Sequence, residues 1–178
     1  MTRIVVDLGA GINKYPGAIS VDSNPITNPD ILHNLDEFPY PFETSSVDEV
    51  RMDNTLEHMV DVIAVLTEIY RISKSNAVVV IDVPYFRARW AFIDPTHKHF
   101  FTVDSMTYFD PNHEHSVLYP YSPAKFICEK LLFNDGLINK NIKTMVIRLA
   151  NRLPGAYERW LSHLYPLDQL TFVLRVIK

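Results

Sequence analysis

The sequence predicts an α/β protein whose strands form one open, mainly parallel sheet. Short β-branched apolar runs recur along the first 84 residues. Loops and one amphipathic helix separate these runs, and polar residues of chemical interest follow directly after them. Strands that alternate with such crossovers build parallel sheets, which bind ligands outside the carboxyl ends of their strands.

Five of the expected strands lie before Pro84. They cover residues 3–8, 18–22, 30–33, 47–52 and 77–83. The last is a continuous apolar run, which is typical of a strand buried on both faces. Before it, apolar residues recur at three- and four-residue steps over residues 56–73, so an amphipathic helix is expected there, ending at the polar segment 73–76.

The segment after Pro84 has a different character. Residues 85–122 are rich in aromatic residues and histidine, and we expect loops there with one short helix near 104–109. Ser122 and Pro123 then predict a helix to about Phe133, because proline is favoured in the first helical turn.

The C-terminal part is expected to complete the sheet. Residues 141–149 and 170–177 are apolar segments that predict a closing antiparallel strand pair, with a helix or lid over 153–165. The prediction is therefore a single domain, residues 1–178, with a seven-stranded sheet that ends in an antiparallel strand.

Composition limits the classes of function. The chain has 178 residues, of which 47% are hydrophobic and 21% charged, as in an ordinary globular domain. A net charge of −4 argues against nucleic acid held by a general basic surface. The single Cys128, expected to be buried on a helix, cannot form an internal disulfide. With no membrane-spanning run and no leader pattern, we expect a cytoplasmic protein.

The turn after the first strand is typical of a nucleotide site. Gly9 and Gly11 follow Asp7, and glycine lets the backbone turn sharply and approach a ligand. Asp22, which ends the second strand, is suited to bind both hydroxyls of a ribose. A glycine turn alone would equally fit an ordinary tight loop, but its combination with Asp22 and the later acids predicts a nucleotide site.

Residues 3–84 resemble the small class I S-adenosylmethionine-dependent methyltransferases of the methyltransferase-11 type. The segments that carry the resemblance are VVDLGAG, NKYPGAISVD, ILHNLDEFPYPFETSSVDEV, LEHMVDVIAVLTEIYRISK and AVVVIDVP. The resemblance implies a Rossmann-like methyltransferase sheet, S-adenosylmethionine as the cofactor, and residues 85–178 as the substrate side.

The resemblance also implies which residues bind the cofactor. In the family the glycine turn holds the methionine part and the acid after the second strand binds ribose. A following acid lies by the adenine, and the end of the fourth strand faces the methionine part and the acceptor. Carried over to this sequence, these residues are Asp7, Gly9, Gly11, Asp22, Asp36 with the backbone of Leu35, and Met52, Asp53 and Asn54.

The spacing departs from the family at the first two crossovers. Ten residues separate Gly11 from Asp22, and eight separate Asp22 from Ile31. A crossover between parallel strands normally needs a dozen or more residues, usually a helix. We therefore expect loops or single turns there, in a trimmed fold with an open cofactor site.

A histidine-rich segment supplies the candidate catalytic residues. The sequence from Asp94 to Thr102 resembles the family segment that borders the substrate pocket. Methyl transfer to a hydroxyl needs an aligned nucleophile and a group that takes its proton. His97 is the preferred base, followed by His99 and His58. The alternative is that these histidines only order their loops by hydrogen bonding.

A metal site is the other interpretation of this region. Two His-x-His pairs, at 97–99 and 113–115, together with Asp94 and Glu114 would supply enough nitrogen and oxygen ligands. Their spacing matches no standard closed site, so no metal ligand is predicted.

The predicted activity is transfer of a methyl group from S-adenosylmethionine to a small or medium-sized acceptor, through an oxygen nucleophile. The resemblance alone suggests a glycan- or lipid-linked acceptor, and self-association stays open. A non-catalytic S-adenosylmethionine-binding module is the alternative. A nicotinamide-dependent oxidoreductase fits less well, because Lys14 stands where G-x-G-x-x-G needs its third glycine, and no P-loop motif exists.

Overall fold

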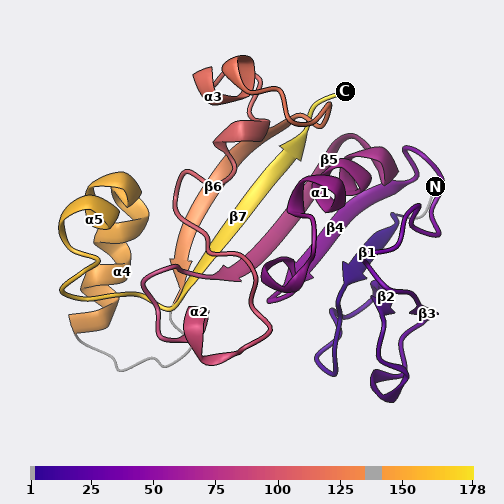
Figure 1. Ribbon diagram of the computed structural model, residues 1–178, viewed down its shortest axis with the longest axis horizontal. Coiled ribbons are helices and arrows are strands. Elements are labelled where there is room, and N and C mark those ends of the chain that lie inside the picture. Colours follow the sequence, from indigo (N-terminus) through magenta and orange to yellow (C-terminus); the bar gives the residue numbers. More distant parts are fainter. Residues whose placement is uncertain (1–2, 135–141) are drawn as a thin grey trace.

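The computed structural model describes residues 3–134 and 142–178. Among them, seven strands form one sheet in the order β3-β2-β1-β4-β5-β7-β6 (Figure 1). The strands are β1 (Val5–Leu8), β2 (Ile19–Asp22), β3 (Ile31–Leu32), β4 (Val47–Asp53), β5 (Ser73–Pro84), β6 (Phe126–Asn134) and β7 (Gln169–Val176). β1 to β5 run parallel to one another, whereas β7 runs antiparallel to its neighbours β5 and β6. The predicted seven-stranded, mainly parallel sheet is confirmed.

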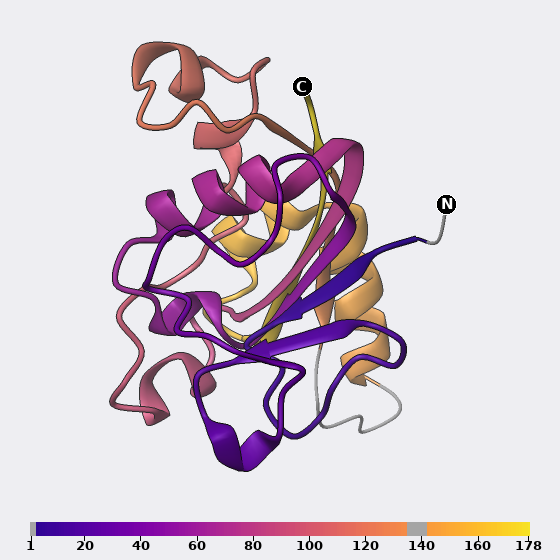
Figure 2. The same cartoon turned by 90° about the vertical axis from the view of Figure 1, so that its right-hand side faces the viewer.

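The helices follow the fourth strand. They are α1 (Val62–Ile72), α2 (Trp90–Ile93), α3 (Glu114–Leu118), α4 (Ile142–Arg152) and α5 (Pro154–Trp160), with 3-10 turns η1 (Pro25–Thr27), η2 (Leu56–His58) and η3 (Thr107–Phe109). In Figure 2, α1, α2 and α3 lie on the same side of the sheet. No helix of the described chain is both long and apolar enough to cross a membrane.

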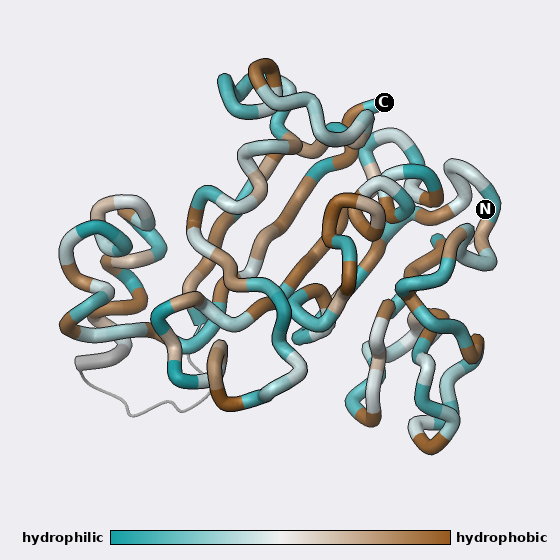
Figure 3. Tube along the Cα trace, in the orientation of Figure 1, coloured by the Kyte–Doolittle hydropathy of each residue, from teal (hydrophilic) through white to brown (hydrophobic). Residues whose placement is uncertain are grey.

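The core lies between α1 and the sheet. The Asp61 carboxylate caps α1 by accepting a hydrogen bond from the Ala64 N–H, at 2.9 Å. Apolar positions of α1 and β5 then face one another and are fully buried; they include Leu66, Ile69 and Ile81. Figure 3 shows hydrophobic residues running along the central strands. Packing on this face of the sheet holds the central strands in place, and with them the loops that follow their carboxyl ends.

The first two crossovers contain no α-helix, as their length predicted. Between residues 9 and 46, all of which the structure describes, the only helical piece is the single turn η1. The β1–β2 loop instead folds against the sheet. The Tyr15 N–H donates to the Asp7 carboxylate at 2.8 Å, and the Arg51 guanidinium lies 3.8 Å from the Tyr15 ring. A loop thus covers part of the sheet where a helix would usually pack.

The predicted helix over residues 56–73 is shorter and divided. Leu56–His58 forms the separate turn η2, and α1 begins only at Val62. Residues 73–76, the polar segment expected to end the helix before the next strand begins, already belong to β5. Asn76 adopts a left-handed φ of 64° there, and the β4–β5 register shifts, so the strand is irregular at this segment.

The predicted helix from Ser122 to Phe133 is wrong, because residues 126–133 belong to strand β6 and residues 122–125 are not helical. β6 pairs with β7 along its whole length, with a register shift between Cys128 and Lys130. The Ser122 hydroxyl oxygen accepts from the Ala124 N–H at 3.0 Å, a contact that resembles the capping bond at the start of a helix. Cys128, expected to be buried, is exposed on this edge strand.

The predicted strand over residues 141–149 is also wrong. Residue 141 lies outside the described residues, and the rest belongs to helix α4. Val146, Ile147 and Ala150 pack against the core at helical spacing, while β6 already occupies the place beside β7. The helix expected within 153–165 and the strand expected over 170–177 are confirmed as α5 and β7.

Candidate active site

The glycine turn packs directly against the loop after β4. Gly9 has a φ of +72°, and a Cβ added there would lie 2.2 Å from the Thr55 Oγ1. Gly11 has a φ of +53°, but a Cβ there would meet open space. Gly9 is therefore required by close approach as well as conformation, whereas Gly11 is required by conformation and leaves room beside it.

Asp22 ties this turn to the end of β2. One carboxylate oxygen accepts from the Gly11 N–H at 2.8 Å, and the other accepts from the Asn24 N–H at 2.8 Å. The carboxylate is thereby fixed beside the glycine turn, and its oxygens keep lone pairs for further donors. The structure thus brings Gly9, Gly11 and Asp22 together.

The loop after β3 reaches the same edge of the sheet. An Asp36 oxygen accepts from the Val60 N–H at 2.8 Å, which joins this loop to the segment before α1. Leu35 is 4% exposed, and its carbonyl accepts from the Tyr40 hydroxyl at 2.9 Å. The half-buried Asp36 faces the segment after β4, while Leu35 belongs to the core.

The end of β4 borders an acidic cavity of about 180 Å³. Asp53 is exposed, whereas Met52 is 1% exposed and belongs both to the core and to the cavity wall. Asn54 has a φ of +45°; its side chain donates to Asp53 at 2.6 Å and accepts from Gln169 at 3.0 Å. The cavity wall is formed by Asp7, Asn13, Lys14, Tyr15, Pro16, Arg51, Met52, Asp53, Val80 and Asp82.

Asp82 and Arg51 are residues of this cavity that sequence reasoning missed. Burial raises the pKa of Asp82 above its ordinary value, although a hydrogen bond from the Thr171 hydroxyl partly offsets the effect. Burial likewise raises the pKa of Asp7. The signal was present, because Asp82 interrupts an apolar run and Arg51 alternates with buried residues of β4.

The histidine-rich segment lies against η2, directly after the β4 end. The Lys98 and His99 N–H groups both donate to the Glu57 carbonyl, at 2.8 and 3.2 Å. The His99 Nε2 lies 2.9 Å from the Met59 carbonyl, so this ring helps to hold the segment in place. The two segments, about 40 residues apart in sequence, form one unit.

Within that unit, Glu57, His58 and His97 form a compact cluster. The His97 Nε2 lies 3.9 Å from a Glu57 carboxylate oxygen, and its side chain is 8% exposed. The His58 and His97 rings are 4.7 Å apart between centroids, edge to face. Glu57 was not predicted as a site residue, because Leu56–His58 was interpreted as the start of a helix.

Glu57 is a buried carboxylate without a hydrogen-bond partner among the described residues. Its side chain is 1% exposed, and neither carboxylate oxygen accepts a hydrogen bond. Burial raises the pKa of Glu57 to about 7. Burial also lowers the pKa of His58. A group this costly to bury is expected where chemistry or binding requires it.

The second His-x-His pair belongs to a different place in the fold. His113 and His115 lie around the start of α3, with ring centroids 4.6 Å apart, and His115 stacks on Tyr108. Among the described residues, the group of metal-ligating side chains that converges is Glu57, His58 and His97. The two His-x-His pairs, at 97–99 and 113–115, therefore do not form a shared metal site, which was the alternative considered from the sequence.

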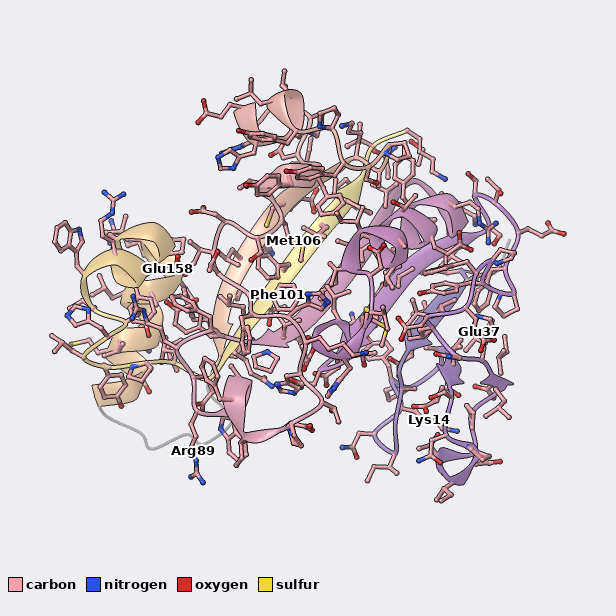
Figure 4. The ribbon with its side chains drawn as sticks, viewed as in Figure 1. Lys14, Glu37, Arg89, Phe101, Met106 and Glu158 are labelled. Atoms are coloured by element: carbon pink, nitrogen blue, oxygen red, sulfur yellow. The ribbon has the colours of Figure 1, made fainter. Side chains whose placement is uncertain are left out.

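A larger cavity of about 620 Å³ lies beside α5. Glu158, labelled in Figure 4, closes one side by accepting from the Val103 N–H at 3.0 Å. Burial raises the pKa of Glu158. The cavity lies among residues of the predicted substrate side: Phe86, Arg87, Val103, Asp104, Gly155, Ala156, Glu158, Arg159 and Trp160.

Lys14 and Glu37 in Figure 4 mark the loops near the opposite end of the molecule, after β1 and β3. Phe101 and Met106, also labelled, are core residues of the segment between β5 and β6. The glycine turn and the histidine-rich segment come from different parts of the chain, and both contact the segment after β4, at Thr55 and at Glu57.

A sheet in the order 3-2-1-4-5-7-6, with strand seven antiparallel and a glycine turn after strand one, is the class I methyltransferase fold. No family model matches the chain, and no curated protein matches it. Solved structures do. A SAM-dependent methyltransferase from Archaeoglobus fulgidus is 19% identical with a TM-score of 0.61, over 97% of this chain and 86% of that one.

Two further structures show how widely this fold is used. An S-adenosylmethionine-dependent methyltransferase from Mesorhizobium loti is 13% identical with a TM-score of 0.58, over 97% of this chain and 90% of that one. The [4+2]-cyclase SpnF is 11% identical with a TM-score of 0.59, over 98% of this chain and 74% of that one. Similarity at this level establishes the fold, and the reaction has to be argued from the site.

Proposed function

We propose that this protein binds S-adenosylmethionine and transfers its methyl group to an oxygen atom of a small or medium-sized acceptor. The observation that carries the proposal is the Asp22 carboxylate, which is fixed 2.8 Å from the Gly11 N–H at the carboxyl end of β2. A carboxylate beside a glycine turn at this place in an α/β sheet is suited to ribose.

The residues present fit this cofactor. The space beside Gly11 admits a ligand close to the backbone. Asp22 offers acceptors for two hydroxyl groups, and Asp36 stands on the next loop towards the adenine side. The cavity with Asp7, Asp53 and Asp82 offers negative charge to the ammonium group of a methionine part.

The side chains after β4 would handle the acceptor. When bound, S-adenosylmethionine supplies an electrophilic methyl group on a sulfonium sulfur. His97, whose Nε2 lies 3.9 Å from the buried Glu57 carboxylate, is proposed to take the proton of an acceptor hydroxyl. His99 is proposed to hold the histidine-rich segment in position. The low exposure of His97 and Glu57 limits competition by water. A glycan- or lipid-linked acceptor remains part of the proposal on sequence grounds.

Calorimetry with S-adenosylmethionine and its demethylated product, S-adenosylhomocysteine, tests the binding. We expect both to bind, and Asp22→Ala to weaken binding about 10- to 100-fold, since it removes hydrogen bonds to a charged group. Asp30→Ala is the matched control. Asp30 also accepts a backbone N–H of β2, from Ser20 at 2.8 Å, but does not touch the glycine turn. Absence of binding by either ligand would refute the proposal.

The alternative of a non-catalytic binding module predicts the same calorimetry but no turnover. Screening hydroxyl and carboxyl acceptors for formation of S-adenosylhomocysteine separates the two. An active acceptor whose turnover falls by at least about 100-fold in His97→Ala would support the catalytic proposal. Binding without turnover on any acceptor class would favour the module.

A further inference from the structure

The cluster of Glu57, His58 and His97 has the features of a metal site. Each residue offers one ligand atom, and these atoms lie within 4.8 Å of one another. The three residues come from two segments held together by backbone hydrogen bonds from Lys98 and His99 to the Glu57 carbonyl. The cluster is therefore anchored by the backbone on both sides.

Among the described residues, hydrogen bonds engage the Nδ1 atoms of His58 and His97 and leave the Nε2 atom of each ring without a hydrogen-bond partner. The His97 Nδ1 lies 3.0 Å from the Ala91 carbonyl, which can only accept, so this nitrogen carries the proton. Thr96 donates its hydroxyl proton to Asp94 at 2.7 Å, so its oxygen accepts from the His58 Nδ1 at 2.9 Å. Both neutral rings then keep an unprotonated Nε2, as in metal-ligating histidines whose other nitrogen donates.

The third group is a buried carboxylate with nothing else to bind. Glu57 is 1% exposed, and neither of its oxygens has a hydrogen-bond partner in the described chain. One oxygen lies 3.9 Å from the His97 Nε2, too far for a hydrogen bond. A cation placed among these atoms would remove the cost of burying the carboxylate.

We propose that Glu57, His58 and His97 bind a divalent transition-metal ion, with zinc as the natural occupant. Two imidazoles and one carboxylate, with a fourth position open, are a ligand set that zinc takes in catalytic sites. Tetrahedral zinc separates its ligand atoms by roughly 3.4 Å. The ligand atoms, now within 4.8 Å, would need only side-chain rotations of modest size.

This site would deepen the proposed function, on which its chemical role rests. An ion beside the acceptor would lower the pKa of an acceptor hydroxyl in the open position, and the proton would leave to solvent water. His97 would then act as a ligand instead of a free base. Binding of the ion itself does not depend on S-adenosylmethionine.

Cobalt(II) is the probe, because it takes the same ligands and its visible absorption reports on coordination. Protein freed of metal with a chelator is titrated with Co²⁺, and then with Zn²⁺ as a competitor. We expect one Co²⁺ per chain, displaced by Zn²⁺. His97→Ala and Glu57→Gln should each weaken binding about 100-fold or more, since each removes a ligand. His115→Ala, a histidine outside the cluster, should leave binding unchanged.

Thermal unfolding of Glu57→Gln gives an independent readout. Without metal and above neutral pH, this variant should be more stable than the natural protein, because the unpaired buried charge is gone; with Zn²⁺, only the natural protein should gain stability. Absence of Co²⁺ binding, or binding that survives both ligand variants, would overturn the proposal. If S-adenosylhomocysteine fails to bind but Co²⁺ binds, the proposed function falls and the metal site stands.

Discussion

Thr55 connects the glycine turn to the Glu57 cluster two residues later. It is 8% exposed, its hydroxyl donates to the Asp53 carbonyl at 2.9 Å, and it occupies the space that a Cβ on Gly9 would need. A side chain at Gly9 would therefore displace the segment after β4. The cofactor side and the acceptor side of the proposed site are thus mechanically linked at this contact.

Gly9→Ala is expected to lower the free energy of unfolding by about 3 kcal/mol or more, because it combines left-handed strain with a clash. Gly17→Ala is the matched control. Gly17 has a similar φ of +80°, but open space beside it, so only the strain of about 1 kcal/mol applies. Urea denaturation measures both. Equal losses would mean that Thr55 moves aside freely, and the link between the two sides would be lost.

Among single residues, the sequence predicted those site residues that belong to a short, local sequence motif. The glycine turn and Asp22 could be predicted, because the strand, turn and second acid are close in sequence. Glu57 could not be assigned a role, because residues 97–99, which contact it, lie about 40 positions away in the sequence. Met52 and the backbone of Leu35 were assigned to the site by resemblance; both side chains are buried, and Met52 also lines the cavity at the end of β4.

A partly buried ion pair between Glu68 and Arg71 joins helix α1 to the loop before β4. Glu68 accepts from the Tyr40 N–H at 2.7 Å and pairs with Arg71 at 2.7 Å. Arg71 also donates to the carbonyls of Tyr40 and Phe42, at 3.1 and 2.9 Å. The 11% exposure of the Glu68 side chain makes this pair different from a surface salt bridge.

Glu68→Ala is expected to destabilise the protein by about 2–4 kcal/mol, because it leaves the Tyr40 N–H and Arg71 without their acceptor. Glu129→Ala is the control. Glu129 makes a similar two-point contact with Arg175, but its side chain is 39% exposed, so less than about 1 kcal/mol is expected. A comparable loss in both variants would contradict the role of burial.

The same pair predicts a pH dependence. Burial alone would raise the pKa of Glu68, but hydrogen bonds from Arg71 and the Tyr40 N–H outweigh it and hold the pKa below its ordinary value. A lowered folded pKa stabilises the protein above the unfolded pKa, and this contribution is lost as pH falls through the folded value. The stability difference between the natural protein and Glu68→Ala should therefore shrink from neutral pH towards about pH 3. A difference that stays constant would exclude ionisation of Glu68 as its source.

Two elements of the second half were mispredicted for reasons visible in their packing. The register shift between Cys128 and Lys130 breaks the two-residue alternation of β6, so its apolar residues do not follow a strand period. In α4, the apolar segment suggested a strand, although Val146 and Ala150 lie four residues apart on the packed side. Which segment pairs with β7 depends on long-range competition that a local pattern does not encode.

In the molecule as a whole, the crossovers from β1 to β2 and from β2 to β3 contain no α-helix. Loops therefore form the wall of the proposed cofactor site. The β1–β2 loop is fastened by a few contacts, among them the Tyr15 N–H to Asp7 and the Gly11 N–H to Asp22. The opposite part of the sheet is different, since β5, β6 and β7 are paired along their length. Local stability is therefore expected to be lowest where the cofactor would bind.

Hydrogen exchange tests this division. Without ligand, amides of residues 9–17 should exchange far faster than those of β7, because little buried structure protects them. Saturating S-adenosylhomocysteine should slow exchange at Gly11 and its neighbours by about 10-fold or more, by linkage, and leave β6 and β7 unchanged. The two strands serve as the internal control. If residues 9–17 were already as protected as β7 without ligand, the trimmed fold would be closed by itself, and a preformed rather than a ligand-ordered wall would shape the site.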